Sequence, residues 1–236
     1  MLIFAKTNTG LVRPTNEDSL LIGHQLYGVA DGMGGHRGGE TASRVAVQVI
    51  RTLLGGKIPE ENTLRVGLEA ANRRIFDMQR RDPALNGMGT TLTLIWESAA
   101  ELLIAHVGDS RAYLYRDGCL ECRTQDHSIV GELLRNKAIT PEMAKTHPYR
   151  SVITRALGTD PIVQPDVFRV EKQDGDVWLL CSDGLYNMVE DAEISSTLES
   201  LRDEPAADRL LALALEHGGT DNVSLVLGRV TEVNAP

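Results

Sequence analysis

The stretch Gly28-Val-Ala-Asp-Gly-Met-Gly-Gly-His-Arg-Gly-Gly-Glu40 carries the feature around which the chain is expected to fold. Its first residues continue an apolar run that is typical of a buried strand, and this run ends at the carboxyl group of Asp31. Glycines dominate the following residues, and their bare backbone lets a ligand approach amide and carbonyl groups closely. We therefore expect Asp31 to stand where a strand ends and a binding loop begins.

The spacing of these glycines argues against the common nucleotide-binding loops. It matches neither Gly-x-Gly-x-x-Gly nor the P-loop, which also requires Gly-Lys-Ser/Thr. Because a carboxylate stands at the head of the loop, a cation is the better expected ligand.

Length and charge define the broad class. Sandwiches and barrels of 236 residues commonly form one domain, and no segment has the composition of a linker, so a single domain over residues 1–236 is expected. The formal net charge of −9 argues against a nucleic-acid or anionic-membrane partner. No apolar run approaches the roughly 20 residues that cross a bilayer, and the Met1-Leu-Ile-Phe start has neither the basic region nor the cleavage site expected of a signal peptide. We expect a soluble, cytoplasmic monomer.

The three cysteines do not make an even disulfide framework. Two of them form Cys119-Leu-Glu-Cys122, which formally matches the Cys-x-x-Cys pattern of redox and zinc sites. The preceding Arg116-Asp-Gly predicts a hairpin turn that leads into a strand, where residues three apart point to opposite faces. A structural role is therefore favoured over redox or zinc chemistry.

Apolar periodicity predicts the remaining elements. Helices are expected over residues 40–54, 61–80, 192–199 and 206–217. Strands are expected over residues 2–7, 90–96, 101–107, 111–115, 119–122, 166–170, 176–181 and 223–230. The strands between residues 90 and 122 are joined by only a few residues each, so they are expected to run antiparallel, because a parallel neighbour needs a long crossover.

The segment from about residue 126 to residue 160 interrupts the strand series. Its periodicity degrades into two short expected helices, one over 129–135 and one from Pro141, followed by Pro148 and Gly158. Long inserted segments of this kind are more often functional flaps than core. We expect a mobile flap here.

Four aspartates, Asp31, Asp109, Asp183 and Asp221, fall at strand ends or turns rather than on helix surfaces. If the strands stack in two antiparallel sheets, these ends can converge at one edge, where unpaired carboxylates would repel each other by several kcal/mol. Divalent cations would remove that cost, and an all-oxygen ligand set favours Mg²⁺ or Mn²⁺. Two such ions about 3.5–4 Å apart would activate a water for hydrolysis of a phosphomonoester.

The loop of residues 8–18, which follows the expected strand 2–7, holds Arg13, Glu17 and Asp18. These residues fit a solvated turn with an aspartate cap, which is the simpler interpretation of the loop alone. They equally fit a site in which Arg13 binds an anion while Asp18 supports a metal.

Six motifs in order resemble the PP2C (PPM) phosphatases, with the bacterial serine/threonine branch as the best match. They are Arg13-x-x-Asn-x-Asp18, Val29-Ala-Asp-Gly-Met-Gly-Gly-His36, Gly89-Thr-Thr91, His106-Val-Gly-Asp-Ser-Arg111, Cys181-Ser-Asp-Gly-Leu185 and Gly219-x-Asp-Asn222. The series covers nearly the whole chain and is far more specific than any single motif. The resemblance implies an α+β fold, an α-β-β-α sandwich of two antiparallel sheets flanked by helix pairs, with a flap subdomain.

The resemblance also implies site roles. Asp31 would bridge two Mn²⁺ or Mg²⁺ ions, Gly32 would offer its carbonyl group to one, and Asp183 and Asp221 would complete the other site. The remaining implied ligands are Asp109, which with Asp183 would hold a third ion, and Asp18, which would bind metal waters. Arg13 would clamp the phosphate. The implied substrates are phosphoserine and phosphothreonine in proteins, with the enzyme opposing a bacterial serine/threonine kinase.

One position departs from the family pattern. Some members place a histidine directly after the Asp-Gly pair as a proposed general acid, whereas this chain has Met33 there and His36 three residues later. Packing of the loop is the favoured role for His36, so no general acid is assigned. His106 is expected to be a satisfied sheet residue, and His127 and His147 flank the flap without the spacing of metal ligands.

Two other functions remain open. The first is a catalytically silent module that binds phosphoproteins with the same surface, although such a module would be expected to lose metal ligands that are all present here. The second is a phosphatase specialised for an anti-sigma-factor antagonist, although no sensor or linker domain accompanies the motifs.

Overall fold

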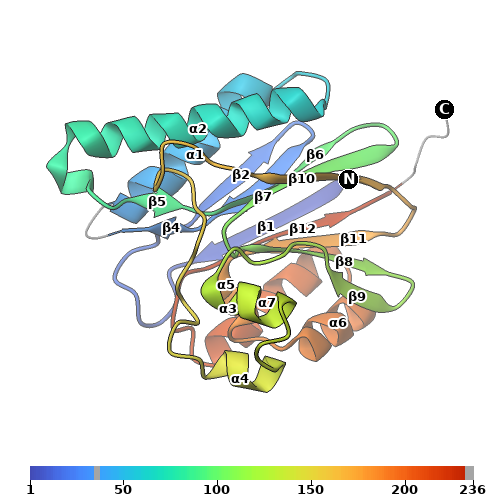
Figure 1. Ribbon diagram of the computed structural model, residues 1–236. Helices are drawn as coiled ribbons and strands as arrows, with labels where there is room; N and C mark the ends of the chain where they lie inside the picture. Colours follow the sequence, from blue (N-terminus) through green and yellow to red (C-terminus); the bar gives the residue numbers. More distant parts are fainter. Residues whose placement is uncertain (35–37, 232–236) are drawn as a thin grey trace.

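The computed structural model of the protein describes residues 1–34 and 38–231. In these residues two antiparallel sheets of five strands each are formed (Figure 1). The first consists, in spatial order, of β1 (Leu2–Asn8), β12 (Val223–Arg229), β11 (Val177–Cys181), β8 (Arg111–Arg116) and β9 (Cys119–Cys122). The second consists of β10 (Asp166–Glu171), β7 (Glu101–Val107), β6 (Leu92–Glu97), β3 (Leu26–Ala30) and β2 (Ser19–Gly23). A separate two-stranded ribbon pairs β4 (Gly32–Met33) with β5 (Gly89–Thr90).

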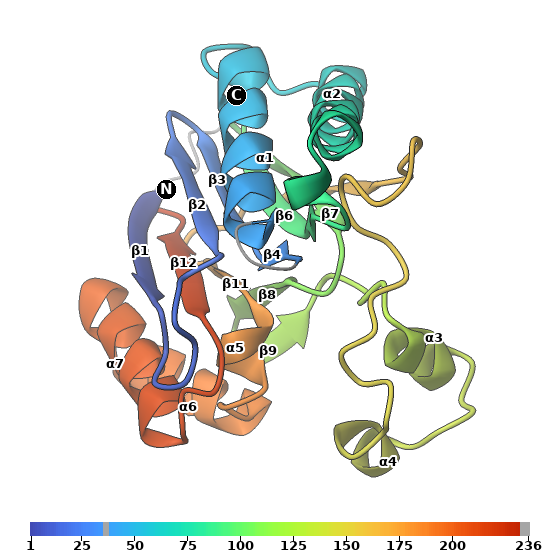
Figure 2. The ribbon, with the colours of Figure 1, turned by 90° about the vertical axis from the view of Figure 1, so that its left-hand side faces the viewer.

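Helices cover the outer faces of both sheets (Figure 1). The second sheet is covered by α1 (Gly38–Leu54) and α2 (Glu61–Arg81), which the 3-10 turn η1 (Pro83–Leu85) follows. The first sheet is covered by α5 (Asp183–Tyr186), α6 (Asp191–Ser200) and α7 (Asp203–Glu216). The short helices α3 (Ile129–Arg135) and α4 (Pro141–Lys145) project from the sandwich (Figure 2). The predicted α-β-β-α sandwich of the α+β class is confirmed.

Three apolar layers hold this architecture together. One lies between α1, α2 and the second sheet, one lies between the first sheet and α5–α7, and the third lies between the two sheets. Central strands are therefore covered on both faces, and every residue of β3, β6 and β11 is buried. This is why these strands have continuous apolar runs rather than the alternation of a half-exposed strand.

The strand expected over residues 90–96 is divided in the structure. Thr91 leaves the ladder because its amide N–H donates to the carbonyl oxygen of Asp31 at 2.9 Å. The hydroxyl group of Thr91 in turn accepts the amide N–H of Asp31 at 2.9 Å. The division of the strand thus fixes the backbone of the first predicted metal ligand on both sides.

The expectation that consecutive short-linked strands pair with each other is correct for β6 with β7 and for β8 with β9. It is wrong for β7 and β8, which belong to different sheets. The turn between them begins at Gly108, whose φ of +108° is unfavourable for other residues, and this backbone carries the chain from one sheet to the other. Periodicity cannot distinguish such a crossing from a hairpin.

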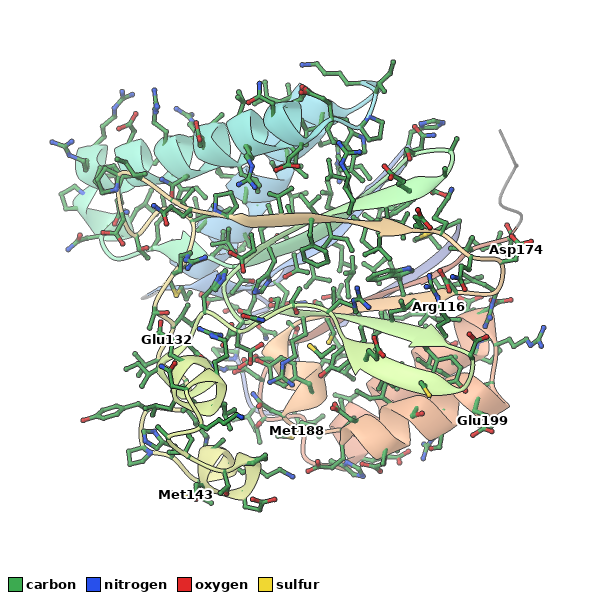
Figure 3. All side chains as sticks on the ribbon, turned by 45° about the vertical axis from the view of Figure 1, so that its right-hand side comes forward. Arg116, Glu132, Met143, Asp174, Met188 and Glu199 are labelled. Carbon is green, nitrogen blue, oxygen red and sulfur yellow. The ribbon has the colours of Figure 1, made fainter. Side chains whose placement is uncertain are left out.

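The segment of residues 126–160, here called the flap segment, is attached to the sandwich at both ends. His127 donates its amide N–H to the carbonyl oxygen of Gly108 at 2.7 Å, and Leu157 donates its amide N–H to that of Thr90 at 2.8 Å. Between these attachments, Glu132 and Met143 lie at the opposite end of the molecule from Arg116 and Asp174 (Figure 3).

Two further sequence predictions concern the cysteines and the membrane. All three cysteines are free, and Cys119 and Cys122 lie on the edge strand β9 after a turn with positive φ at Asp117 and Gly118. The predicted hairpin is confirmed. Within residues 1–34 and 38–231, no helix combines the length and apolarity needed to cross a bilayer.

Candidate metal centre

The predicted metal ligands come from separate elements that end close together. Asp31 directly follows β3, Asp109 lies in the turn after β7, Asp183 begins α5, and Asp221 is separated from β12 by Asn222 alone. Asp31 interacts electrostatically with the other three and with Asp18. The structure therefore brings together all five aspartates that were singled out from the sequence.

Burial and mutual repulsion raise the pKa of four of these carboxyl groups, those of Asp18, Asp31, Asp109 and Asp183. Burial, with Asp18 as the strongest neighbouring charge, raises the pKa of Asp31 well above its usual range. Burial raises the pKa of Asp109 and Asp18 to about 7, and nearby Asp183 contributes to both shifts. Burial also raises the pKa of Asp183, to about 6, although a hydrogen bond with Asp31 opposes this shift. The protein alone does not neutralise these groups.

Asp18 is held in an incomplete environment. The hydroxyl group of Ser182 donates a hydrogen bond to Asp18 Oδ2 at 2.9 Å. The other carboxylate oxygen of Asp18, Oδ1, is buried and has no hydrogen-bond partner among the described residues. A buried carboxylate oxygen without a partner carries a desolvation cost, which a bound cation or its water would remove.

The backbones around Asp31 and Asp183 leave no room for side chains. A Cβ atom on Gly32 would lie 2.2 Å from the carbonyl oxygen of Gly39, and one on Gly184 would lie 2.0 Å from that of Asn222. Each contact is shorter than any real Cβ contact, so a side chain would push the neighbouring segment away. Glycine is thus required next to two predicted ligands because chain segments touch there through their backbones.

Asn222 ties the Arg13 loop to the strand that carries Asp221. Its side-chain amide donates to the carbonyl oxygens of Thr9 at 2.8 Å and Thr15 at 2.9 Å, and its Oδ1 accepts the amide N–H of Glu17 at 2.8 Å. Sequence reasoning quoted Asn222 only as a motif residue and assigned it no role. These three bonds position the loop that contains both Arg13 and Asp18.

Arg13 lies at the exposed rim of the carboxylate cluster. Its Nη2 donates to Asp221 Oδ2 at 2.7 Å, with 52% of the arginine side chain and 32% of the aspartate side chain exposed. This hydrogen bond raises the pKa of Arg13, so the guanidinium group remains charged. An exposed cation beside buried carboxylates is suited to an incoming anion, which supports the functional interpretation of the loop over that of a solvated turn.

The donor set fits hard divalent ions that retain water. In the described part of the chain, no three or more His, Cys, Asp or Glu side chains are arranged to surround one ion. Mg²⁺ and similar ions are usually held by one or two carboxylates and keep several waters, so a complete protein cage is not required. The carboxylates and the unpartnered Asp18 oxygen agree with Mn²⁺ or Mg²⁺ rather than zinc, and no histidine or thiol is grouped with them in residues 1–34 and 38–231.

Sequence reasoning did not identify several residues that support the cluster. The hydroxyl group of Thr91 bonds to the backbone of Asp31, and that of Tyr186 bonds to the backbone of Asp109. The hydroxyl group of Ser182 bonds to the side chain of Asp18. Hydroxyl residues give no sequence pattern that distinguishes such contacts from ordinary sheet packing. His36 lies outside the described residues.

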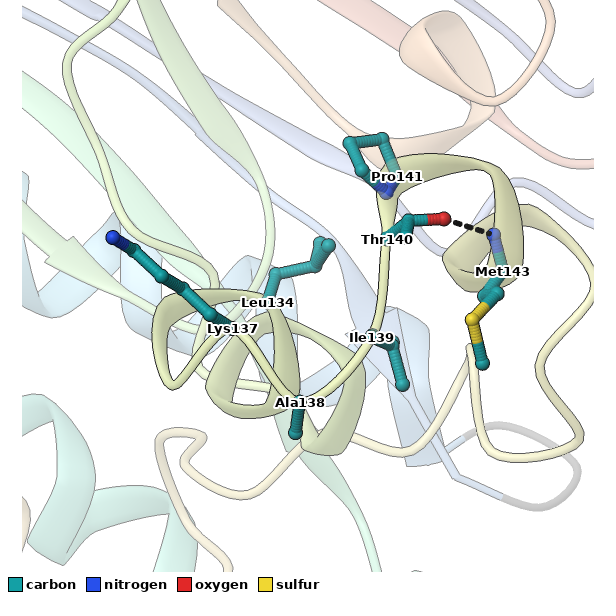
Figure 4. Close-up of a pocket in the computed structure, with 7 residues that line it drawn as sticks. All are labelled: Leu134, Lys137, Ala138, Ile139, Thr140, Pro141 and Met143. Carbon is teal, nitrogen blue, oxygen red and sulfur yellow. Dashed lines mark hydrogen bonds between the residues drawn. The ribbon is translucent and has the colours of Figure 1, made fainter.

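A hollow of about 590 Å³ lies on the flap segment and is separate from this cluster (Figure 4). It is lined by Leu134, Lys137, Ala138, Ile139, Thr140, Pro141 and Met143. None of these residues is a predicted metal ligand, so the hollow is not the place of the reaction.

Comparison with known proteins assigns the family. The family model of protein phosphatase 2C matches residues 16–224. The chain belongs to the protein phosphatase 2C family. This membership confirms the resemblance inferred from the six motifs, and it extends over the parts of the chain that carry Asp18, Asp31, Asp109, Asp183 and Asp221.

Two similar proteins and one solved structure illustrate the relationship. The serine/threonine protein phosphatase PstP of Mycobacterium tuberculosis is 42% identical over 97% of this chain, which spans only 45% of that protein. The serine/threonine phosphatase stp of Listeria welshimeri is 39% identical, with 94% of this chain and 93% of that protein covered. The catalytic domain of PstP in complex with two manganese ions is 39% identical over 98% of both chains, with a TM-score of 0.90.

The raised pKa values predict how pH affects the metal-free protein. In EDTA, the free energy of unfolding should fall as pH rises from about 4 to about 7. The folded pKa of Asp18, about 7, exceeds its ordinary value of 3.8, so stability present at low pH is lost as the folded group ionises. Saturating Mn²⁺ should abolish this fall. Urea denaturation across this pH range, with Asp18→Asn as the comparison, measures it; equal slopes for both proteins would contradict the assignment.

Asn222→Ala should weaken Mn²⁺ binding by about 10- to 100-fold, as is typical when residues that orient ligands are removed. The reason is that the loop with Arg13 and Asp18 loses three hydrogen bonds. Equilibrium dialysis against Mn²⁺ is the measurement, and the exposed Asn62→Ala is the matched control. If both variants bind Mn²⁺ as the wild type does, Asn222 does not position the loop.

Proposed function

We propose that this PP2C protein is a metal-dependent serine/threonine protein phosphatase that uses two Mn²⁺ or Mg²⁺ ions. One observation carries the proposal: in the described residues the carboxyl groups of Asp18, Asp31, Asp109 and Asp183 come together beside Asp221 without a cation bonded to any of the four, and a buried oxygen of Asp18 has no hydrogen-bond partner. The related PstP catalytic domain, similar over 98% of the chain, is described with two manganese ions.

The proposed roles follow the positions of the residues. Asp31, on which the charges of the other four aspartates act, would hold both ions, and the Gly32 carbonyl group would be a further ligand of one of them. Asp183 and Asp221 would hold the second ion, and Asp18 would bind waters of the ions. Asp109, with Asp183, would hold a third ion more weakly. The charges of Asp18, Asp183, Asp109 and Asp221 all act on Asp31, which supports its central place in this arrangement.

The chain's own residues supply binding and orientation. Bound ions would supply an activated water and positive charge beside the phosphoryl group. Arg13 binds the phosphoryl oxygens from the exposed rim, and Asp221 orients its guanidinium group through the 2.7 Å hydrogen bond. Met33 follows Gly32 and carries no proton to donate, so we assign no general acid to this position.

The proposed substrates are phosphorylated proteins, including a bacterial serine/threonine kinase, and the proposed compartment is the cytoplasm. The names of the PstP and stp relatives support the substrate class. The free thiols of the described chain agree with a reducing compartment. We further propose that residues 1–236 form one catalytic domain with the flap segment as its variable part, and that this domain acts as a monomer.

The purified protein should release phosphate from phosphothreonine peptides with Mn²⁺ and lose this activity in EDTA. Asp183→Asn should reduce the rate by at least about 100-fold, because one ion loses its ligand while the other remains. Asp208→Asn, which changes an ion pair with Lys6 outside the carboxylate cluster, is the matched control. Phosphopeptide binding without turnover in the wild type would instead support a silent binding module.

Arg13→Lys should raise KM for a phosphopeptide by about 10- to 100-fold while Mn²⁺ binding stays near the wild-type value. Lysine keeps the charge but loses the planar pair of donors that fits two phosphoryl oxygens. Arg209→Lys, at an exposed ion pair with Glu216, serves as the control. Steady-state kinetics decide the point; an unchanged KM would exclude Arg13 as the phosphate ligand.

A further inference from the structure

The turn that carries Asp109 is attached to the flap segment by two hydrogen bonds. His127 Nδ1 accepts the amide N–H of Gly108 at 3.1 Å, and the amide N–H of His127 donates to the carbonyl oxygen of Gly108 at 2.7 Å. Both polar backbone groups of Gly108 are thus bound by one residue of the flap segment. Asp109 is the next residue along the chain, so the orientation of this peptide unit bears directly on its carboxyl group.

The hydrogen bonds determine which nitrogen of His127 carries the proton. Because Nδ1 accepts from Gly108, a neutral ring carries its proton on Nε2, which lies 3.1 Å from Asp166 Oδ2 and 2.9 Å from Arg155 Nη1. A guanidinium group cannot accept this proton, so Asp166 is its acceptor. The other carboxylate oxygen of Asp166 accepts from Arg155 Nη1 at 3.0 Å. His127 is only 3% exposed, and burial lowers its pKa, which favours the neutral ring that this arrangement requires. Arg155 thus contacts both Asp166 and His127, and His127 connects this pair to Gly108.

These contacts connect both ends of the flap segment. His127 lies near the first residue of the segment and Arg155 lies near its last. The two ends also meet directly, because Thr154 donates its amide N–H to the carbonyl oxygen of His127 at 2.8 Å. The position of Gly108 therefore depends on both attachments of the flap segment together.

Other residues hold the turn but bind different groups. Tyr186 donates its hydroxyl group to the carbonyl oxygen of Asp109 at 3.0 Å, and Thr93 donates to that of Ser110 at 2.8 Å. Within the described residues, only His127 accepts the amide N–H of Gly108. Loss of its ring would leave a donor without a partner in a buried turn, and the turn would rotate to find another.

We propose that His127 is a positioning residue that orients the Asp109 carboxylate toward a third divalent ion, with Asp166 fixing its tautomer. This inference rests on the proposed function, since Asp109 is a ligand only if the metal centre exists. A carboxylate that orients a histidine, which in turn orients a ligand, is a common arrangement around metal sites. Here the histidine acts on the backbone next to the ligand rather than on the ion.

Three variants and two measurements test the proposal. In His127→Asn the side-chain oxygen takes the place of Nδ1 and can accept from Gly108, whereas His127→Ala removes the acceptor. Asp166→Asn keeps a hydrogen-bonding group but removes the charge that fixes the tautomer. The measurements are amide hydrogen exchange of Gly108 in EDTA, observed by NMR, and calorimetric titration with Mn²⁺.

In His127→Ala, the Gly108 amide should exchange at least about 10-fold faster, and the weakest Mn²⁺ ion should bind about 10- to 100-fold less tightly. The two tighter ions should bind as in the wild type. His127→Asn should restore most of both values, and Asp166→Asn should give smaller changes in the same direction. A role for His127 in general packing alone would not produce recovery by asparagine.

Unchanged Gly108 exchange and unchanged affinity for the weakest ion in His127→Ala would overturn the proposal. If His127→Ala does not fold, His127→Asn and Asp166→Asn decide, and wild-type values in Asp166→Asn would overturn the role of Asp166. A wild-type protein that binds no third Mn²⁺ would also overturn the proposal, whereas the two-ion phosphatase would remain supported by the EDTA and Asp183→Asn results.

Discussion

The repulsion among the carboxyl groups of Asp18, Asp31, Asp109, Asp183 and Asp221 is the constraint on which the rest of the structure depends. Each group is attached to a different segment, and partial burial makes its charge costly. A domain is stable by only about 5–15 kcal/mol, so a cluster of unneutralised charges removes a substantial part of that margin. Divalent ions that bind only the folded chain restore this lost stability, because binding to the folded state shifts the equilibrium toward folding.

The sandwich resists this repulsion with its backbone rather than with side-chain cations. Arg13 is the single cation bonded to one of these five carboxylates in the described residues, and it lies at the exposed rim. Elsewhere, segments touch directly, as where a Cβ atom on Gly10 would lie 2.1 Å from the carbonyl oxygen of Asp221. Such contacts keep the ligands apart from bulky groups and leave the charge free for ions. The same backbone contacts therefore hold the segments in place and leave the aspartates without side-chain cations.

Local pattern was sufficient to predict most helices and strands, the hairpin at Asp117 and Gly118, and the strand ends and turns that carry Asp31, Asp109, Asp183 and Asp221, because burial and turn geometry leave traces in neighbouring residues. The layers and the role of Asp18 came instead from the resemblance to the family. Local pattern could not predict that β7 and β8 enter different sheets, since a turn of three residues serves either path. It also could not find the role of Asn222, whose three partners lie more than 200 residues away. Spacing contains no information about such contacts.

The flap segment illustrates how one loop can combine a fixed and a variable part. Its attachment points are buried, with His127 at 3% and Leu157 at 0% exposure, and each bonds to a backbone beside a predicted ligand. Its middle is open, with Met143 at 53% and Tyr149 at 57% exposure. The middle makes none of the bonds that hold Gly108 and Thr90. Substitutions there would therefore change an exposed surface and leave these two attachments in place.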